Sequence, residues 1–204
     1  MLEIREISGA DKSTIDTIVE IHMNTFTGFF LTFMGKGFLR QMYSCYCAHE
    51  PSGLLTAFDE SGKPVGFVAY SGDLSGLYKF MLKKRLIPFA WYAFGAFLRK
   101  PNAFFRIVRA FLKPGESKRQ EAYVELASIG VSPEQKGTGV GSALIAALKA
   151  RVDFSQYAYI TLETDAVDNE PANRFYQKNG FVLKRSFATP EGRKMNEYRF
   201  EGNL

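Results

Sequence analysis

The sequence contains few of the residues that build disulfide frameworks and metal sites. Two cysteines and two histidines occur among its 204 residues. Cys45 and Cys47 lie two positions apart in a stretch that we expect to be helical, where such neighbours point in different directions. We therefore predict neither a disulfide framework nor a bound metal.

Long hydrophobic runs are also missing. The apolar run Leu86–Leu98 has 13 residues, whereas a helix needs roughly 20 to cross a bilayer. The first residues, Met1–Ile7, alternate as a strand does and lack the basic and apolar regions of a secretory signal. A chain of this length suffices for one domain with a hydrophobic core. We expect a single domain over residues 1–204 in the cytoplasm.

Hydrophobic periodicity predicts a strand, two helices and a β-hairpin in the N-terminal part of the chain. The second hairpin strand ends near Tyr70, and an aromatic loop, Phe26–Phe33, joins the two helices. The predicted elements cover residues 2–7, 15–23, 35–46, 54–59 and 64–70.

A glycine-spaced turn lies between a predicted strand and a predicted helix. The strand covers Glu121–Val131, the turn is Glu134-Gln-Lys-Gly-Thr-Gly-Val-Gly141, and the helix follows from Ser142. Such a turn leaves backbone N–H groups unpaired at the positive end of the helix dipole. The pattern therefore predicts a phosphate-binding site.

Two common phosphate-binding loops fit this turn less well. A nucleoside triphosphatase loop ends in GK[ST], which does not occur in this sequence. A dinucleotide-binding loop reads G-x-G-x-x-G and is followed by an acidic residue about 20 residues later. Glu163 stands near the position of that acid, but Ser142 replaces the third glycine. On the turn alone, a dinucleotide site remains an alternative.

A second motif follows in the next predicted helix, Asn169-Glu-Pro-Ala-Asn-Arg-Phe-Tyr-Gln-Lys-Asn-Gly-Phe181. Together the two motifs resemble the GNAT superfamily of acyl-CoA-dependent N-acyltransferases, whose loop reads R/Q-x-x-G-x-G/A and whose helix reads N-x-x-A-x-x-F-Y-x-x-x-G-F. The second motif matches at every specified position. In the first, Gly139 and Gly141 fit, while Lys136 stands where the family prefers Arg or Gln and keeps only their positive charge. The resemblance covers residues 121–187 well and the N-terminal third of the chain only by its general pattern.

The resemblance implies an α/β fold with a central mixed β-sheet flanked by helices, and acetyl-CoA as the donor. It implies that the donor is held by a bulged or splayed strand end, where Gly130 suits the break. It also implies that the segment between the first two helices lines the acceptor pocket, although that segment could equally pack in the core. The implied donor residues are Ile129, Gly130, Val131, Lys136, Gly137, Thr138, Gly139, Val140, Gly141, Ser142, Asn169 and Asn173, and the implied acceptor residues are Phe26, Phe29 and Phe30.

Acyl transfer to an amine needs a proton acceptor and a proton donor. The resemblance points to Glu125 as the general base, and partial burial there would raise the pKa of its carboxyl group. His22 is a second candidate for the base. The resemblance points to Tyr176 as the general acid that protonates the departing thiolate. The alternatives are a surface charge for Glu125 and a packing aromatic for Tyr176.

Residues 76–119 have no counterpart in the family pattern. Between Lys79 and Arg119 the sequence holds eleven basic residues and Glu116 alone as an acid, a net charge of +10, whereas the whole chain carries +5. We predict a helical insertion between the third and fourth strands, with a second helix whose apolar face holds Phe104, Val108, Phe111 and Leu112.

Three interpretations of this insertion stay open. It packs on the sheet or in a homodimer interface, residues 79–113 dock peripherally on an anionic membrane, or it covers a phosphorylated acceptor. Nucleic-acid binding is not expected, because the aromatic residues are grouped in one apolar run.

The favoured interpretation is an N-acetyltransferase domain that moves the acetyl group of acetyl-CoA to the primary amine of a small molecule. The amine attacks directly, without a covalent enzyme intermediate. An aromatic loop and a basic insertion suit an amino sugar, phosphorylated or linked to a nucleotide. The alternatives are a noncatalytic acyl-CoA-binding or membrane-docking module and a protein N-acetyltransferase.

Overall fold

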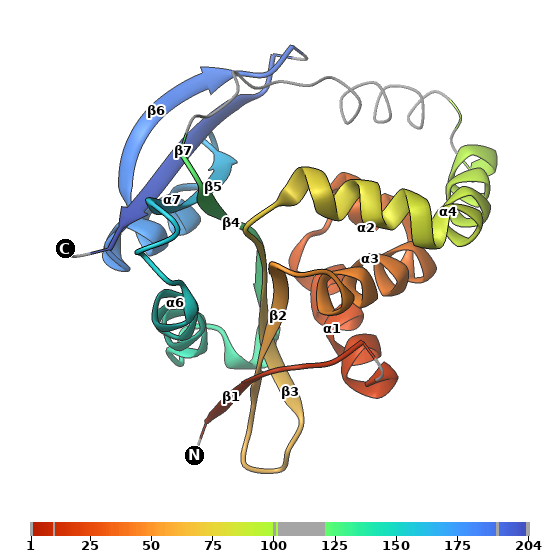
Figure 1. Ribbon diagram of the computed structural model, residues 1–204, viewed down its shortest axis with the longest axis horizontal. Helices are drawn as coiled ribbons and strands as arrows, with labels where there is room; N and C mark the ends of the chain where they lie inside the picture. The colour runs from red at the N-terminus through yellow and green to blue at the C-terminus, as the bar shows by residue number, and fades with distance from the viewer. Residues whose placement is uncertain (1, 10, 100, 102–120, 191, 203–204) are drawn as a thin grey trace.

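Seven strands form one mixed sheet in the order β1-β2-β3-β4-β5-β7-β6 (Figure 1). The computed structural model describes residues 2–9, 11–99, 101, 121–190 and 192–202. Strands β4 and β5 run parallel, and the other neighbouring strands are antiparallel. The predicted fold class is confirmed. The strands span Glu3–Glu6 (β1), Ser52–Phe58 (β2), Pro64–Ser71 (β3), Tyr123–Val131 (β4), Tyr159–Asp165 (β5), Val182–Ala188 (β6) and Lys194–Glu201 (β7).

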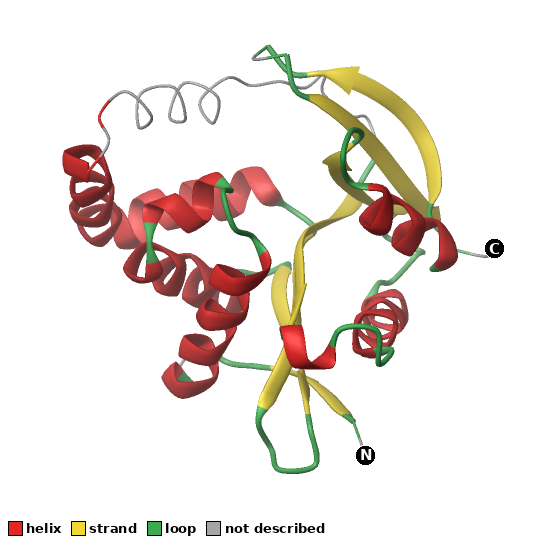
Figure 2. Cartoon of the chain, turned by 180° about the vertical axis from the view of Figure 1, so that it is seen from behind, coloured by secondary structure: helices red, strands yellow, loops and turns green. Residues whose placement is uncertain are grey.

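Helices cover both faces of this sheet (Figure 2). Four of them belong to the N-terminal part of the chain: α1 (Lys12–Thr25), α2 (Phe30–Met34), α3 (Lys36–Ala48) and α4 (Leu74–Arg99). The others follow β4 and β5: the 3-10 turn η1 (Pro133–Gln135), α6 (Val140–Arg151) and α7 (Glu170–Lys178).

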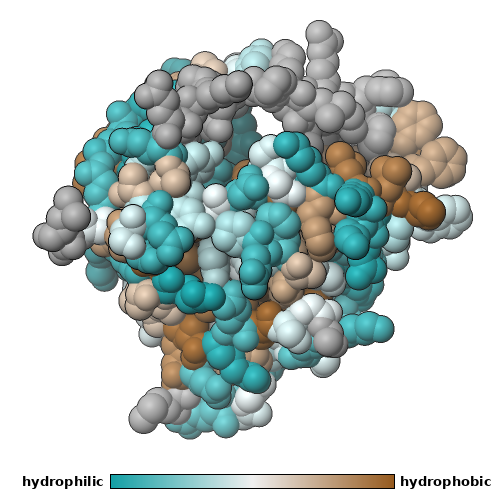
Figure 3. Space-filling view, viewed as in Figure 1, coloured by the Kyte–Doolittle hydropathy of each residue, from teal (hydrophilic) through white to brown (hydrophobic). Residues whose placement is uncertain are grey.

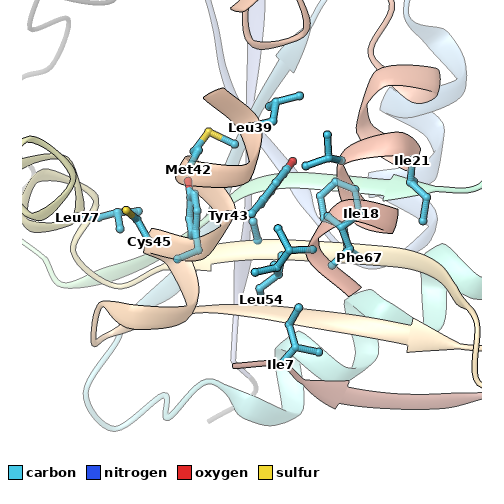
Figure 4. Close-up of a cluster of buried hydrophobic side chains, with 14 of the residues drawn as sticks. Ile7, Ile18, Ile21, Leu39, Met42, Tyr43, Cys45, Leu54, Phe67 and Leu77 are labelled. Atoms are coloured by element: carbon cyan, nitrogen blue, oxygen red, sulfur yellow. The ribbon is translucent and has the colours of Figure 1, made fainter. Parts of the chain in front are cut away.

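Side-chain alternation along the central strands creates two hydrophobic cores. Leu54 and Phe67 face α1, α3 and α4, where they pack with Ile18, Leu39 and Tyr43 (Figure 4). Their neighbours in the chain face the other way and pack under α6, in a core that also holds Leu144, Ile160 and Tyr198. The sheet therefore separates an α1–α3 side from an α6–α7 side.

The aromatic segment between α1 and α3 is only partly the loop that the sequence predicts. Gly28 has a φ of +83°, a left-handed conformation that breaks the helical path between α1 and the next helix. The helix α2 then begins at Phe30, and the hydroxyl of Thr32 donates a 2.6 Å hydrogen bond to the Phe26 carbonyl. The helical turn and the Thr32 hydroxyl thus form hydrogen bonds with backbone groups that an irregular loop would leave unpaired.

In the described part of the insertion, one long helix lies between β3 and β4, as the sequence predicts. Helix α4 is kinked at Arg85 (φ −136°, ψ 22°), three residues before Pro88. Proline has no N–H to donate within a helix, and its ring crowds the preceding turn, so a kink is expected there. The predicted second helix, with Phe104 to Leu112, lies outside the described residues. Within the described residues, no helix is long and apolar enough to cross a membrane.

Candidate active site

Strands β4 and β5 separate after the first three residues of β4. Their parallel pairing covers Tyr123–Tyr159, Val124–Ile160 and Glu125–Thr161. Beyond Glu125, β4 continues to Val131 along β3 alone. The strand end that should hold a pantetheine arm is therefore splayed.

The bulge in β4 lies at Ala127, so the predicted break at Gly130 was wrong. Against β3, Leu126 pairs with Tyr70 and Ser128 pairs with Ala69, which leaves Ala127 as the extra residue. Gly130 pairs regularly, and a Cβ atom there would lie 2.8 Å from a ring carbon of Phe67. Glycine at this position makes room for Phe67 rather than for a bulge.

The bulge sets which side chains of β4 share a face. Val124 and Leu126 point into the α6 core before the bulge, and Ile129 and Val131 pack against the same core after it. Glu125 and Ser128 consequently both face the α1–α3 side, although they are an odd number of residues apart. Ser128 hydrogen-bonds to Tyr43 of α3.

Glu125 lies close to a buried tyrosine of α3. Burial, together with the nearby charges of Tyr78 and Glu125, raises the pKa of Tyr46 well above its usual value. Glu125 is half-buried. The predicted base is thus on the strand that splays, on the face that an acceptor would approach from the α1–α3 side.

The glycine turn after β4 presents backbone N–H groups at the start of α6. Gly137 and Gly139 have φ angles of +84° and +93°, and Gly139 caps the helix without a side-chain bond. In the described structure, the N–H groups of Val140, Gly141 and Ser142 donate to no protein acceptor. Together with the helix dipole, they are suited to bind an anion. Lys136, at the lead position of the motif, is exposed beside it.

Gly141 connects the two motifs by close packing. A Cβ atom at this position would lie 3.1 Å from Cζ of Phe175 in α7. A side chain at residue 141 would therefore require Phe175 to shift, and glycine lets the start of α6 pack closely against α7. Nothing lies within 4 Å of a Cβ built on Gly137 or Gly139, so those two glycines leave open space for a ligand.

The two asparagines of the second motif play different parts. Asn169 precedes α7 and donates a 2.8 Å bond to the hydroxyl of Thr164. The amide of Asn173 donates to the carbonyls of Asp165 and Asn169 and accepts from Asn196 and Tyr198. These four bonds use all donors and lone pairs of the amide. Asn173 therefore fixes the start of α7, and we do not include it among the cofactor residues.

Tyr176 projects from α7 into the α6 core. Its ring lies against Phe175, Phe181 and Tyr198, with centroid separations of 5.4, 6.1 and 6.0 Å. Burial raises the pKa of Tyr176 to about 12. The phenol is thus protonated at neutral pH.

The aromatic segment lies at the open end of β4. The hydroxyl of Thr25 donates to the carbonyl of Val131 at 3.3 Å, which fixes the end of α1 to the end of the strand. Phe29 is 44% exposed, and the Arg193 guanidinium lies 5.3 Å from its ring centre. Phe26 packs between Phe29 and His22, and Phe30 begins α2. Of the three predicted acceptor residues, Phe29 is the most exposed.

The acetyltransferase (GNAT) family model matches residues 15–181 of the chain. The chain belongs to this family. No curated protein sequence matches it.

Solved structures show the same fold. An N-acetyltransferase from Staphylococcus aureus is 15% identical, with a TM-score of 0.61, and 98% of each chain is covered. The ribosomal-protein-S18-alanine N-acetyltransferase from Escherichia coli is 14% identical (TM-score 0.60, 100% of this chain and 96% of that one). The Arabidopsis thaliana protein NAA60, in complex with acetyl-CoA, is 15% identical (TM-score 0.59, 100% of both).

Sequence reasoning missed a charged pair beside the aromatic segment of this GNAT protein. Arg193, in the turn between β6 and β7, forms an ion pair through two nitrogen atoms with Asp165 at the end of β5. The sequence feature that could have placed Arg193 is a turn with Pro190 and Gly192, which lies between residues 182–188 and 194–201. The resemblance ended at residue 187, before this turn.

A layer of charged and aromatic side chains continues over β5 and β7 on the same face as Glu125. The rings of Tyr123 and Tyr159 stack at 5.7 Å, and the Arg199 guanidinium lies 4.1 Å from the centre of the Tyr159 ring. Glu197 is fully buried and accepts from Arg185 and Arg199 at 2.6 and 2.8 Å. This face of the GNAT protein is polar and preorganised.

His22, the second candidate for the base, is a buried residue of α1. Its Nδ1 lies 2.7 Å from the hydroxyl of Tyr43, while its Nε2 has no partner among the described residues. Burial lowers the pKa of His22 to about 4. A neutral, enclosed imidazole is better suited to supporting Tyr43 than to taking a proton from a substrate.

Protonation of His22 is expected to destabilise the fold at low pH. In the unfolded chain the pKa of the ring returns to about 6.5, so below that pH the unfolded state binds the extra proton and is favoured. Stability is therefore full above about pH 6.5 and falls by up to roughly 3 kcal/mol towards about pH 4. In His22→Gln the free energy of unfolding, measured with urea, should lose this part of its pH dependence.

The matched control is His49→Gln, because His49 is the other histidine of the chain and its ring is only half-buried. It should keep the wild-type pH dependence. An unchanged slope in His22→Gln would show that other groups control acid unfolding.

Proposed function

We propose that this GNAT protein transfers the acetyl group of acetyl-CoA to the primary amine of a small molecule by direct attack. The observation that carries the proposal is the course of β4. One strand presents Glu125 on the face that an acceptor would approach, splays from β5, and leads directly into the anion site at the start of α6. Base, thioester and phosphate sites are thereby aligned along one element.

The residues present fit acetyl-CoA. The N–H groups of Val140, Gly141 and Ser142 suit its pyrophosphate, with the charge of Lys136 nearby. Residues Ile129–Val131 do not pair with β5. Their backbone N–H and C=O groups on that edge can therefore hydrogen-bond to the pantetheine amides. Asn169 stands at the start of α7 for a further contact. When bound, acetyl-CoA supplies the acetyl group as a reactive thioester.

Two side chains carry the proton transfers. Glu125 accepts a proton from the acceptor ammonium, directly or through water, so that a neutral amine can attack. The hydroxyl of Tyr176 donates a proton to the sulfur that departs. Neither step needs a covalent bond to the enzyme.

The acceptor face favours a molecule with a flat or ring-shaped apolar surface and polar substituents. Phe29 offers an exposed aromatic ring, and Arg193 stands beside it. Sugar and base rings stack on such side chains. The Arg193 guanidinium is paired with Asp165 through two nitrogen atoms, so only its remaining N–H groups are left for a phosphate. An amino sugar that carries a phosphate or a nucleotide combines these features.

The test is the release of free coenzyme A thiol from acetyl-CoA in the presence of separate amines. The panel contains amino sugars, their phosphates and nucleotide-linked forms, polyamines, and a peptide with a free N-terminal alanine. We expect release with an amino-sugar derivative. Release with the peptide alone would identify a protein acetyltransferase, and acetyl-CoA binding without release for any amine would identify a noncatalytic module.

Replacement of Gly139 by Ala is expected to weaken acetyl-CoA binding while the fold is kept. Alanine in the left-handed region costs about 1–2 kcal/mol, so the loop leaves the conformation that aims its N–H groups. Isothermal titration should show about a tenfold or greater loss of affinity.

Gly62→Ala provides the control for this variant. Gly62 has a φ of +78° in the β2–β3 hairpin and, like Gly139, has nothing within 4 Å of its Cβ position. It should cost similar stability without loss of affinity. Gly141 is unsuitable for the test, because a side chain there would displace Phe175. Equal affinity in wild type and Gly139→Ala would remove the loop from the donor site.

A further inference from the structure

The outer face of α4 is a continuous row of exposed apolar side chains. Ile87, Trp91, Phe94 and Leu98 are 82%, 73%, 55% and 64% exposed. Their spacing of four, three and four residues places them on one side of a helix. Figure 3 shows hydrophobic side chains gathered over α4 at the right of the molecule. We call these four residues the α4 row.

The opposite side of the same helix is fixed to the domain. Phe89 and Ala96 are buried, and the Phe89 ring meets Phe38 of α3 with centroids 4.8 Å apart. A Cβ atom on Gly37 would collide with Tyr92, so the backbone of α3 approaches α4 closely. The α4 row is therefore held outward by packing on the other face.

A shallow groove borders the row. It has a volume of about 360 Å³ and lies between α4 and the junction of α2 and α3. Its lining residues are Met34, Gly35, Lys36, Gly37, Trp91, Tyr92, Phe94, Gly95 and Leu98. Trp91, Phe94 and Leu98 are thus accessible from two directions. A row and groove of this kind on a domain surface indicate a site of interaction.

Charge around the row identifies the surface that it fits. Lys79, Lys83, Lys84 and Arg85 are exposed on the first half of α4, and Arg99 and Lys100 follow Leu98 in the sequence. Between Asp73 and Glu116 the sequence contains no acidic residue. Apolar side chains with a tryptophan, bordered at both ends by cations, match the boundary between acyl chains and anionic headgroups.

We propose that the α4 row docks this protein on an anionic phospholipid membrane. Ile87, Trp91, Phe94 and Leu98 enter the headgroup region, and the lysines of the first half of α4 contact lipid phosphates. The part of α4 after the kink at Arg85, which carries the row, lies along the interface, since its apolar stretch is too short to span a bilayer.

The single tryptophan of the chain makes the proposal directly measurable. Trp91 belongs to the row, so tryptophan emission, excited at the red edge where the ten tyrosines do not absorb, reports on the docking surface alone. Mixed phosphatidylcholine–phosphatidylglycerol vesicles should shift its emission to the blue, reduce quenching by acrylamide, and sediment the protein. Added salt should reverse these effects, and vesicles of phosphatidylcholine alone should bind much less.

Two sets of variants assign the binding to this face. Phe94→Ser/Leu98→Ser keeps Trp91 and should weaken vesicle binding roughly tenfold or more. The control is Val182→Ser, because Val182 of β6 is also exposed (60%) but lies outside the row; it should not weaken binding. Lys79→Ala/Lys83→Ala/Lys84→Ala should weaken it by up to roughly 100-fold, about fivefold for each charge. Its control removes three exposed lysines elsewhere, Lys12, Lys63 and Lys178. Circular dichroism checks that each variant is folded.

Three results would overturn the proposal. One is the absence of binding to anionic vesicles by the wild-type protein. Another is binding that persists in folded Phe94→Ser/Leu98→Ser. The third is a dimer in analytical ultracentrifugation that the same substitutions dissociate, without vesicle binding, because the row would then be covered by a second copy.

Discussion

Glu125→Gln is expected to lower kcat/KM for the acceptor amine by about 10²–10⁴ at neutral pH. Glutamine keeps the size and polarity of the side chain, but it cannot accept a proton. An amine is mostly protonated at neutral pH and cannot attack until that proton is removed. The measurement is initial-rate kinetics of coenzyme A release at saturating acetyl-CoA, with the acceptor found in the amine screen.

The pH dependence separates a base from a residue that only positions the substrate. A general base acts in its deprotonated form, so wild-type kcat/KM should rise with pH through the pKa of the carboxyl group. In Glu125→Gln this acidic limb should disappear, and activity should follow only deprotonation of the amine. Full activity across the profile would assign the proton transfer to another group or to bulk water.

Glu163→Gln is the matched control for Glu125→Gln. Glu163 lies on β5, the strand that pairs with β4, and is exposed. Its replacement removes one negative charge from the same region of the sheet. A similar loss of activity in both variants would indicate a general electrostatic effect rather than a base.

Local sequence patterns were sufficient for much of this fold. The apolar periods of α1 and α3 and the β2–β3 hairpin have strong local signals, and the structure has all of them close to the predicted bounds. The turn and helix around Gly139 were predictable because positive φ angles and a helix start require particular residue types. The helix α7 followed from its motif.

Features set by tertiary packing were not legible in the sequence. Strand β6, Val182–Ala188, is exposed at nearly every position and shows no alternation of apolar residues. The bulge at Ala127 is a property of the register between β3 and β4, and no residue type marks it. Gly130 attracted the prediction because glycine often marks bulges, yet its cause is the ring of Phe67 on the neighbouring strand.

The candidate site shows the same division. Glu125 and Ser128 share a face only because of the bulge, and Asn173 is occupied by groups from β5 and β7 that are distant in sequence. Arg193 reaches Phe29 from the opposite end of the chain. The motifs are local in sequence and mark the candidate donor site, whereas the surroundings of the candidate acceptor site depend on long-range pairing.

Tyr176→Phe is expected to lower kcat by about tenfold to a thousandfold with little change in the KM for acetyl-CoA. The ring and its contacts with Phe175 and Tyr198 are kept, so the melting temperature should change little. Only the proton donor to the departing sulfur is removed, and that interaction matters in the transition state. Pre-steady-state and steady-state rates of thiol release measure the effect.

The control for Tyr176→Phe is a second buried tyrosine of the same core. Tyr198 donates a 2.9 Å hydrogen bond to Asn173, so Tyr198→Phe should cost stability, about 1 kcal/mol, with a smaller effect on kcat.

Because burial raises the pKa of Tyr176 to about 12, the phenol stays protonated throughout the neutral and mildly alkaline range. An alkaline fall in activity well below that value must then come from another group and should persist in Tyr176→Phe. If the fall disappears in this variant, or if kcat is unchanged, Tyr176 packs the core and the thiolate takes its proton from elsewhere.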